Sequence, residues 1–159
     1  MNITFNLNGK EVSVDSRPDK RLSALLRDDL NLKGLRKGCS NGHCGNCVVL
    51  MDDQLVSSCI IPAFAARHKN IITIEGFSQT KEFSDILTGF KEAGVHLCTY
   101  CAPARVLSTA YMLRKHIVPT VDQINDNISS VQCRCSSFSL LKQGIIQASL
   151  QYSKRKTNG

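Results

Sequence analysis

Eight cysteines in two groups of four constrain this 159-residue chain more than any other feature. The first group follows the pattern C-x4-C-x2-C-x11-C, and the second joins a C-x2-C pair to a later C-x-C pair. The first group consists of Cys39, Cys44, Cys47 and Cys59, and the second of Cys98, Cys101, Cys133 and Cys135. No cysteine is left over, so each group offers four thiolates to one metal site.

The spacing of the first group indicates an iron–sulfur cluster. A C-x4-C-x2-C run completed by a distant cysteine is typical of plant-type [2Fe–2S] ferredoxins. Gly38, Gly42 and Gly45 allow the backbone to curl closely around a metal and leave amide N–H groups free to point at sulfur. A structural zinc site is the alternative, although zinc sites favour two close pairs of ligands. His43 could replace a thiolate, as in Rieske centres, but with four cysteines present we interpret it as a surface residue.

The second group is less familiar from its spacing alone. Cys98 and Cys101 are expected at the beginning of one helix and Cys133 and Cys135 just before another, so two helix N-termini would face one anionic cluster. Ligands at i and i+2 cannot share a helix face, which predicts an extended or turning segment for the last pair. Arg134 between them either holds the cluster or a partner, or is an ordinary solvated arginine.

The net charge and the residues at the N-terminus bear on the expected partners and location. The formal charge of +7 suggests nucleic acid, but each oxidised cluster with its thiolates carries about −2, so two clusters leave about +3. The N-terminus lacks the charged and apolar regions of a signal peptide, and no apolar run is long enough to cross a bilayer. We therefore expect no nucleic acid and no membrane as partners, and a cytoplasmic location, where cysteines more often hold metal than form disulfides.

The first half of the chain has the pattern of a small sheet with one helix. Alternating residues on both sides of Asn8-Gly9 predict a hairpin, and a second hairpin is expected across Asp52-Asp53. Leucines at helical spacing over 22–30 predict a helix that packs on the sheet, and apolar residues over 71–74 predict a final strand.

The second half is predicted to be helical. Four apolar stripes at helical spacing indicate four helices, and Thr120 with Gln123 forms a capping box at the start of the third. We accordingly divide the chain into residues 1–77, residues 78–153 and a basic tail over 154–159 that should be frayed. The predicted fold class is α+β.

The whole cysteine pattern resembles the small iron–sulfur subunit of the xanthine dehydrogenase family of molybdenum hydroxylases. Supporting segments are Leu25-Leu26-Arg27, Lys33 to Cys39, Ser58-Cys59 and Thr73 to Gly76. The resemblance implies a β-grasp, plant-type ferredoxin-like domain over 1–77 and a four-helix [2Fe–2S]-binding domain over 78–153. It also implies that the first cysteine group holds the cluster nearer a flavin and the second group the cluster nearer molybdenum. The implied partners are a molybdopterin-binding large subunit and an FAD-binding subunit.

The chain departs from the family pattern around its second cysteine group. The family has a glutamine that hydrogen-bonds the pterin cofactor where this chain has Leu97, which has no polar side-chain atom. Alanine and serine also replace glycines there, which restricts the approach of the backbone. His96 or Thr99 could take over the lost contact, or His96 is merely an exposed histidine at a helix end.

No other pattern of catalytic or cofactor-binding residues is present. There is no G-x-G-x-x-G between a strand and a helix, no P-loop and no catalytic Ser/His/Asp arrangement, so we expect no catalytic residue and no substrate site of its own. We predict the iron–sulfur subunit of an oxidoreductase, which passes electrons from a molybdopterin site to a flavin through two [2Fe–2S] clusters. The alternatives are a degenerate member of the same family with an altered second cluster or partner, and a basic zinc-binding module. The resemblance favours a purine or related N-heterocycle as the substrate of the complex, chosen by the large subunit.

Overall fold

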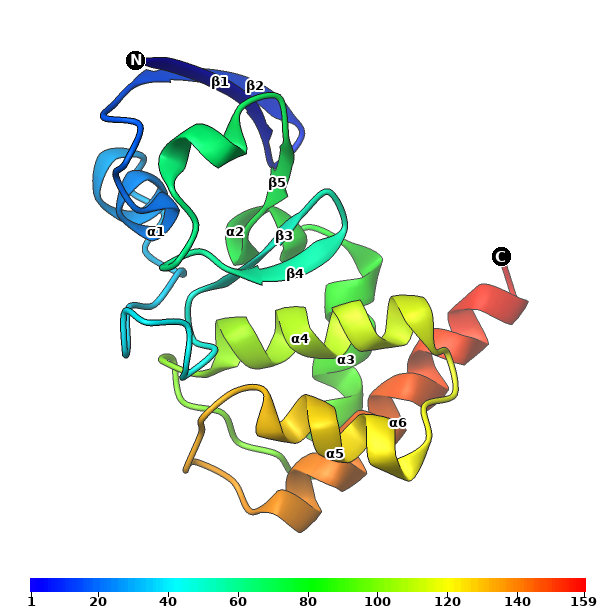
Figure 1. Cartoon of the computed structure of the whole chain (residues 1–159). Helices are drawn as coiled ribbons and strands as arrows, with labels where there is room; N and C mark the ends of the chain where they lie inside the picture. Colours follow the sequence, from blue (N-terminus) through cyan, green and yellow to red (C-terminus); the bar gives the residue numbers. More distant parts are fainter.

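A mixed five-stranded sheet forms the first half of the protein, which is described here by a computed structural model of residues 1–159 (Figure 1). The strands lie in the order β2-β1-β5-β3-β4, with β1 and β5 parallel and every other neighbouring pair antiparallel. Their bounds are Asn2–Leu7 for β1, Lys10–Asp15 for β2, Val48–Met51 for β3, Gln54–Ser57 for β4 and Asn70–Ile72 for β5.

Both predicted hairpins are confirmed. Asn8 and Gly9 join β1 to β2 with φ values of 52° and 82°, and Asp52 and Asp53 join β3 to β4 with φ values of 48° and 61°. Two consecutive residues with positive φ make a type I′ turn, whose twist matches that of the flanking strands. These turns fix the register of the two outer strand pairs.

The predicted helix over 22–30 is present in a modified form. It begins as α1 (Leu22–Ala24) and continues as the π-helix η1 (Leu25–Asp29), in which the amide of Leu30 bonds the carbonyl of Leu25. Leu22, Leu25 and Leu26 are fully buried against the sheet. A short 3-10 helix, η2 (Ala63–Ala66), covers the same core.

Four longer helices form the second half, as the sequence predicts. They are α3 (Lys81–Glu92), α4 (Ala102–Lys115), α5 (Val121–Ser129) and α6 (Phe138–Thr157). The capping box of Thr120 and Gln123 begins α5. None of the helices is both long and apolar enough to cross a membrane.

Two expectations need correction. The last strand ends at Ile72 instead of 74, because the side chain of Asn8 accepts a hydrogen bond from the amide of Thr73 and Ile74 begins a short helix, α2 (Ile74–Phe77). The basic tail is also helical as far as Thr157, so the predicted fraying does not begin at 154. Arg155 pairs with Asp85 of α3, and the basic residues of the last turn suit the negative end of the helix dipole.

Strand β3 belongs to two hydrophobic cores and thereby joins the two halves. Val49 points into the core between the sheet and α1, whereas Val48 and Leu50 point into the core formed by the helices. Alternation of side chains along a strand produces this division. The two halves therefore share a strand, and the loops that carry the cysteines meet at one end of this shared boundary (Figure 1).

Gly89 sets the distance between α3 and α6. A Cβ atom at this position would lie 2.2 Å from the backbone nitrogen of Ala148, so the two helices approach more closely than any larger residue permits. Alanine normally stabilises a helix interior by about 1 kcal/mol relative to glycine. Here the steric conflict is with backbone atoms and should outweigh that gain.

We predict that Gly89→Ala lowers the free energy of unfolding by about 1–3 kcal/mol, the usual cost of overpacking. Urea denaturation of the cluster-loaded chain would measure it. The exposed neighbour Thr88 provides the control, because Thr88→Ala on the same helix turn should be neutral or slightly stabilising. A Gly89→Ala variant as stable as the Thr88→Ala variant would contradict the close packing.

Candidate metal centres

The first cysteine group lies in the loop between η1 and β3, closed by Cys59 just after β4. Backbone amides point at its sulfur atoms. The donors are His43 and Cys44 to the Sγ of Cys39, at 3.1 and 3.2 Å, and Gly42 to the Sγ of Cys59, at 3.2 Å. Such N–H groups stabilise negative charge on sulfur, which is what a thiolate-bound cluster requires.

Three glycines make this loop geometry accessible. Gly42 and Gly45 have φ values of 80° and 72°, a region that side chains disfavour. A Cβ atom on Gly38 would lie 2.6 Å from the Sγ of Cys44. The loop is therefore a backbone cradle around sulfur, and its donor set fits a [2Fe–2S] cluster.

The thiols of this loop differ in their affinity for protons. The amide of Asn41, together with that of Cys44, lowers the pKa of the exposed Cys39 thiol to about 6. Burial raises the pKa of Cys47 to about 11. His43 contributes its backbone amide to Cys39 while its side chain lies in the exposed part of the loop, in accord with its interpretation as a surface histidine.

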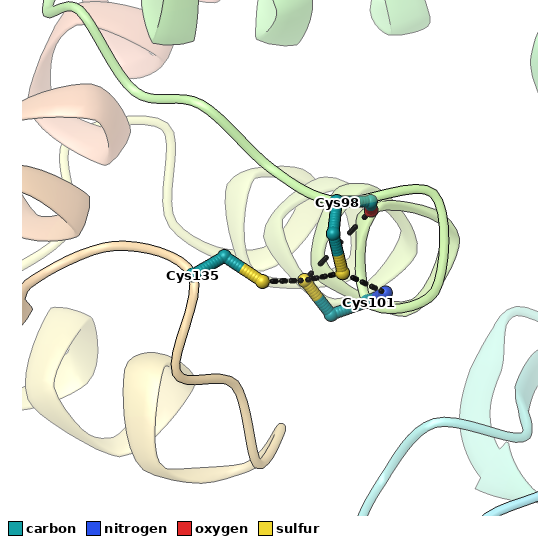
Figure 2. A group of neighbouring side chains, drawn as sticks. All are labelled: Cys98, Cys101 and Cys135. Atoms are coloured by element: carbon teal, nitrogen blue, oxygen red, sulfur yellow. Dashed lines mark hydrogen bonds between the residues drawn. The ribbon is translucent and has the colours of Figure 1, made fainter.

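The second cysteine group comes together from two segments that lie far apart in the sequence (Figure 2). The Sγ of Cys101 lies 3.5 Å from that of Cys98, 3.1 Å from that of Cys133 and 3.4 Å from that of Cys135. All are free thiols. The two pairs therefore lie together around the Sγ of Cys101.

Local structure explains how these ligands are presented. Cys101 is the N-cap residue of α4, and Cys133 and Cys135 lie in an irregular segment before α6, as their spacing predicts. The amide of Cys101 lowers the pKa of Cys98 to about 7, whereas burial and the neighbouring thiols raise the pKa of Cys101. Four thiolates at these distances repel one another, so the site suits a strongly positive metal centre.

The two cysteine groups are joined by backbone contacts. The carbonyl of Cys44 accepts a 2.9 Å hydrogen bond from the amide of Gln132, the residue before Cys133. A Cβ atom on Gly45 would lie 2.1 Å from the carbonyl oxygen of Ser130, so only glycine fits there. The hydroxyl of Tyr100 also donates to the carbonyl of Lys37. The loop of the first group therefore rests directly on the segment that carries the second.

The residues around the second cysteine group differ in their exposure to solvent. Leu97 is half-buried and packs against the helical core, whereas Thr99 and Arg134 are exposed. His96 is exposed as well, and its carbonyl accepts from the hydroxyl of Ser136 at 2.8 Å, which ties the two cysteine segments together.

One buried charge beside the second group was not predicted from the sequence. Arg105 in α4 is 1 % exposed, and it donates hydrogen bonds to three backbone carbonyls in the segment that precedes Cys133. The sequence feature that could have indicated this burial is the position of Arg105 four residues after Cys101, on the same helix face and within an apolar stripe.

Comparison with known proteins agrees with this geometry. Residues 5–70 match the 2Fe-2S iron-sulfur cluster binding domain, and residues 73–147 match the [2Fe-2S] binding domain. The chain is 38% identical to the nicotinate dehydrogenase small FeS subunit of Eubacterium barkeri over 136 residues, which span 86% of this chain and 87% of that protein. The chain belongs to the xanthine dehydrogenase family as an iron–sulfur subunit.

Other relatives of this iron–sulfur subunit support the same conclusion. The xanthine dehydrogenase iron-sulfur-binding subunit of Escherichia coli O157:H7 is 29% identical over 91% of this chain and 91% of its own length. The solved structure of quinoline 2-oxidoreductase from Pseudomonas putida 86 contains a chain with a TM-score of 0.88 and 26% identity, covering 98% of this chain and 96% of that one. The α+β fold class, the two [2Fe–2S] domains and membership of an oxidoreductase are thereby confirmed, and the zinc-binding alternative is not supported.

The cysteine pKa values predict which thiols react first in the metal-free subunit. At pH 7.5 iodoacetamide should alkylate Cys39 and Cys98 before Cys47 and Cys101, since only a thiolate attacks. Alkylation of Cys39 should slow as the pH falls through about 6, where its lowered pKa places protonation. Peptide mass spectrometry over a time course measures this order. Equal labelling of all eight cysteines would show that the loops are not formed without metal.

Proposed function

We propose that this subunit transfers electrons between two [2Fe–2S] clusters that its own cysteines ligate. One cluster is held by Cys39, Cys44, Cys47 and Cys59, and the other by Cys98, Cys101, Cys133 and Cys135. Each bound cluster supplies a site that accepts and releases one electron. The chain itself supplies the ligands, the amides that stabilise them and the fixed separation between the two sites.

The observation that carries this proposal is the hydrogen bond between Cys44 and Gln132. It connects a ligand of one group to the residue beside a ligand of the other, at an N···O distance of 2.9 Å. From the sulfur of Cys44 to that of Cys133 the connection is otherwise covalent. A protein that merely stored metal would have no need for such contact, whereas an electron carrier gains from a short and rigid one.

We further propose that the two sites belong to the domains 1–77 and 78–153. The matched regions, 5–70 and 73–147, support a boundary in this part of the chain. The turn from strand β5 into helix α2, at Thr73, lies close to it.

Both cysteine groups contain exposed cysteines, which favours one partner subunit at each group. Cys39 is exposed on the first group, and Cys98 and Cys135 are exposed on the second. We propose an FAD-binding subunit at the first and a molybdopterin-binding large subunit at the second, in a cytoplasmic complex. Leu97 cannot hydrogen-bond a pterin, so docking there would depend on backbone groups or on His96 and Thr99.

The relatives also suggest a class of substrate for the complex. Nicotinate, xanthine and quinoline appear in the names of similar proteins, and all three are N-heterocycles. We propose that the large subunit oxidises a ring of this class.

Serine substitution of single ligands tests the cluster assignment. The intact chain should hold about four irons, and Cys44→Ser and Cys101→Ser should each retain about two, because each variant loses one [2Fe–2S] cluster. Iron analysis and electron paramagnetic resonance of the reduced proteins would show it. Thr99→Ala, at an exposed position between two ligands, should keep all the iron. Bound zinc in place of iron, or loss of all iron from either serine variant, would contradict the assignment.

The partner proposal is tested by purifying the full chain from its native host through an affinity tag. We expect the assembly to contain molybdenum and FAD, and to reduce a flavin-linked dye with an N-heterocyclic substrate. A chain that purifies without molybdenum and FAD, while it retains both clusters, would refute the proposed partners. Activity on aldehydes alone would refute only the proposed substrate class.

A further inference from the structure

Arg105 is the one charged residue among the buried residues of the protein. It lies one helical turn after Cys101 on α4, and its backbone amide bonds the carbonyl of Cys101 at 3.0 Å. Arginine is almost never fully buried unless it is paired. Its position therefore calls for a partner of opposite charge.

The hydrogen bonds of Arg105 all go to neutral backbone carbonyls. Its guanidinium donates to Asn127 and Ile128 at 3.1 Å, in the last turn of α5, and to Val131 at 2.8 Å. These contacts fix the segment that enters the second cysteine group, since Val131 precedes Cys133 by two residues. A bend of this segment would displace Cys133.

No carboxylate neutralises this guanidinium. None of the ion pairs of the protein includes Arg105, and its Nε atom is buried without a hydrogen-bond partner. The C-terminal end of α5 supplies only about half a negative charge. An unpaired buried charge is costly, so a further anion is needed.

The second cysteine group lies next to the residues that Arg105 contacts. Cys101 precedes Arg105 by one turn of α4 and accepts a hydrogen bond from its backbone amide, and Cys133 follows by two residues the Val131 carbonyl that the guanidinium binds. Thiolates that hold a cluster at these positions would therefore place negative charge near the guanidinium. In a buried environment such charges interact more strongly than in water.

We propose that Arg105 is the counter-charge of the second cluster, which positions Cys133 and raises the reduction potential of that cluster. The inference rests on the ligand assignment proposed above. Reduction adds one negative charge to the cluster, and a fixed positive charge nearby stabilises the reduced form more than the oxidised form. The second site would thereby accept an electron more readily than the same ligands would without the arginine.

A purely structural role is the competing explanation, because the guanidinium of Arg105 reaches the C-terminal end of α5 and caps carbonyl groups there. Three variants separate the two roles. Arg105→Lys keeps the charge, Arg105→Gln keeps hydrogen-bond donors without charge, and Arg105→Met removes both. The measurement is a potentiometric titration of the full chain with both clusters loaded, monitored by electron paramagnetic resonance.

We expect Arg105→Gln and Arg105→Met to lower the potential of the second cluster by at least about 59 mV, a tenfold change for a one-electron couple. Arg105→Lys should stay close to the unmodified chain, and the first cluster should not shift in any variant. Loss of the second cluster from both neutral variants, with retention in Arg105→Lys, would equally support a required charge. Equal potentials in all variants, or equal loss of the cluster from all of them, would overturn the proposal.

Arg114 is the matched control on the same helix. It pairs with Glu82 at 2.9 Å and lies nine residues beyond Arg105, about 13 Å along the axis. Arg114→Met should reduce stability without changing either potential, and a shift as large as that of Arg105→Met would show a non-specific effect and refute the proposal. Iron analysis keeps the outcomes separate, because an unmodified chain with about two irons would refute the ligand assignment instead.

Discussion

Mutual repulsion of thiolates is the constraint on which both sites of this protein depend. The Sγ of Cys101 lies within 3.5 Å of three other sulfur atoms, a distance at which four negative charges cannot remain without compensation. Metal binding provides most of that compensation and contributes its free energy to folding. The protein provides the remainder through groups that it holds in place around the sulfur atoms.

The two sites meet this constraint in different ways. At the first, backbone amides of a glycine-containing loop point at Cys39 and Cys59, so the compensating charge is spread over several dipoles. At the second, the beginning of α4 and one buried guanidinium, Arg105, lie beside the cysteines. Strand β3 and the bond between Cys44 and Gln132 hold these two environments in a fixed relation. Fixed separation and unequal electrostatics are what direct an electron from one site to the next.

Local patterns could be predicted from the sequence because their causes are local. The Asn8-Gly9 hairpin and the capping box at Thr120 each depend on residue types at short spacing, and both are present. The pattern of elements predicted the α+β class and family resemblance added the [2Fe–2S] domains, and the comparisons confirm both. Long-range packing accounts for what was missed. The contact between Gly45 and Ser130 joins residues 85 positions apart, and no sequence pattern around either residue indicates it. Arg105 has the residue type of a surface position, and only the packing of α4 against α5 buries it.

One chain holds two clusters, and the loops that carry their ligands contact each other through the hydrogen bond between Cys44 and Gln132. Low-temperature electron paramagnetic resonance of the fully reduced chain tests this arrangement most directly, because two nearby unpaired spins interact. We predict two [2Fe–2S] signals of equal intensity, each split or broadened by the other when both clusters are reduced. A single signal, or two signals whose shapes do not change as the second cluster is reduced, would contradict this claim.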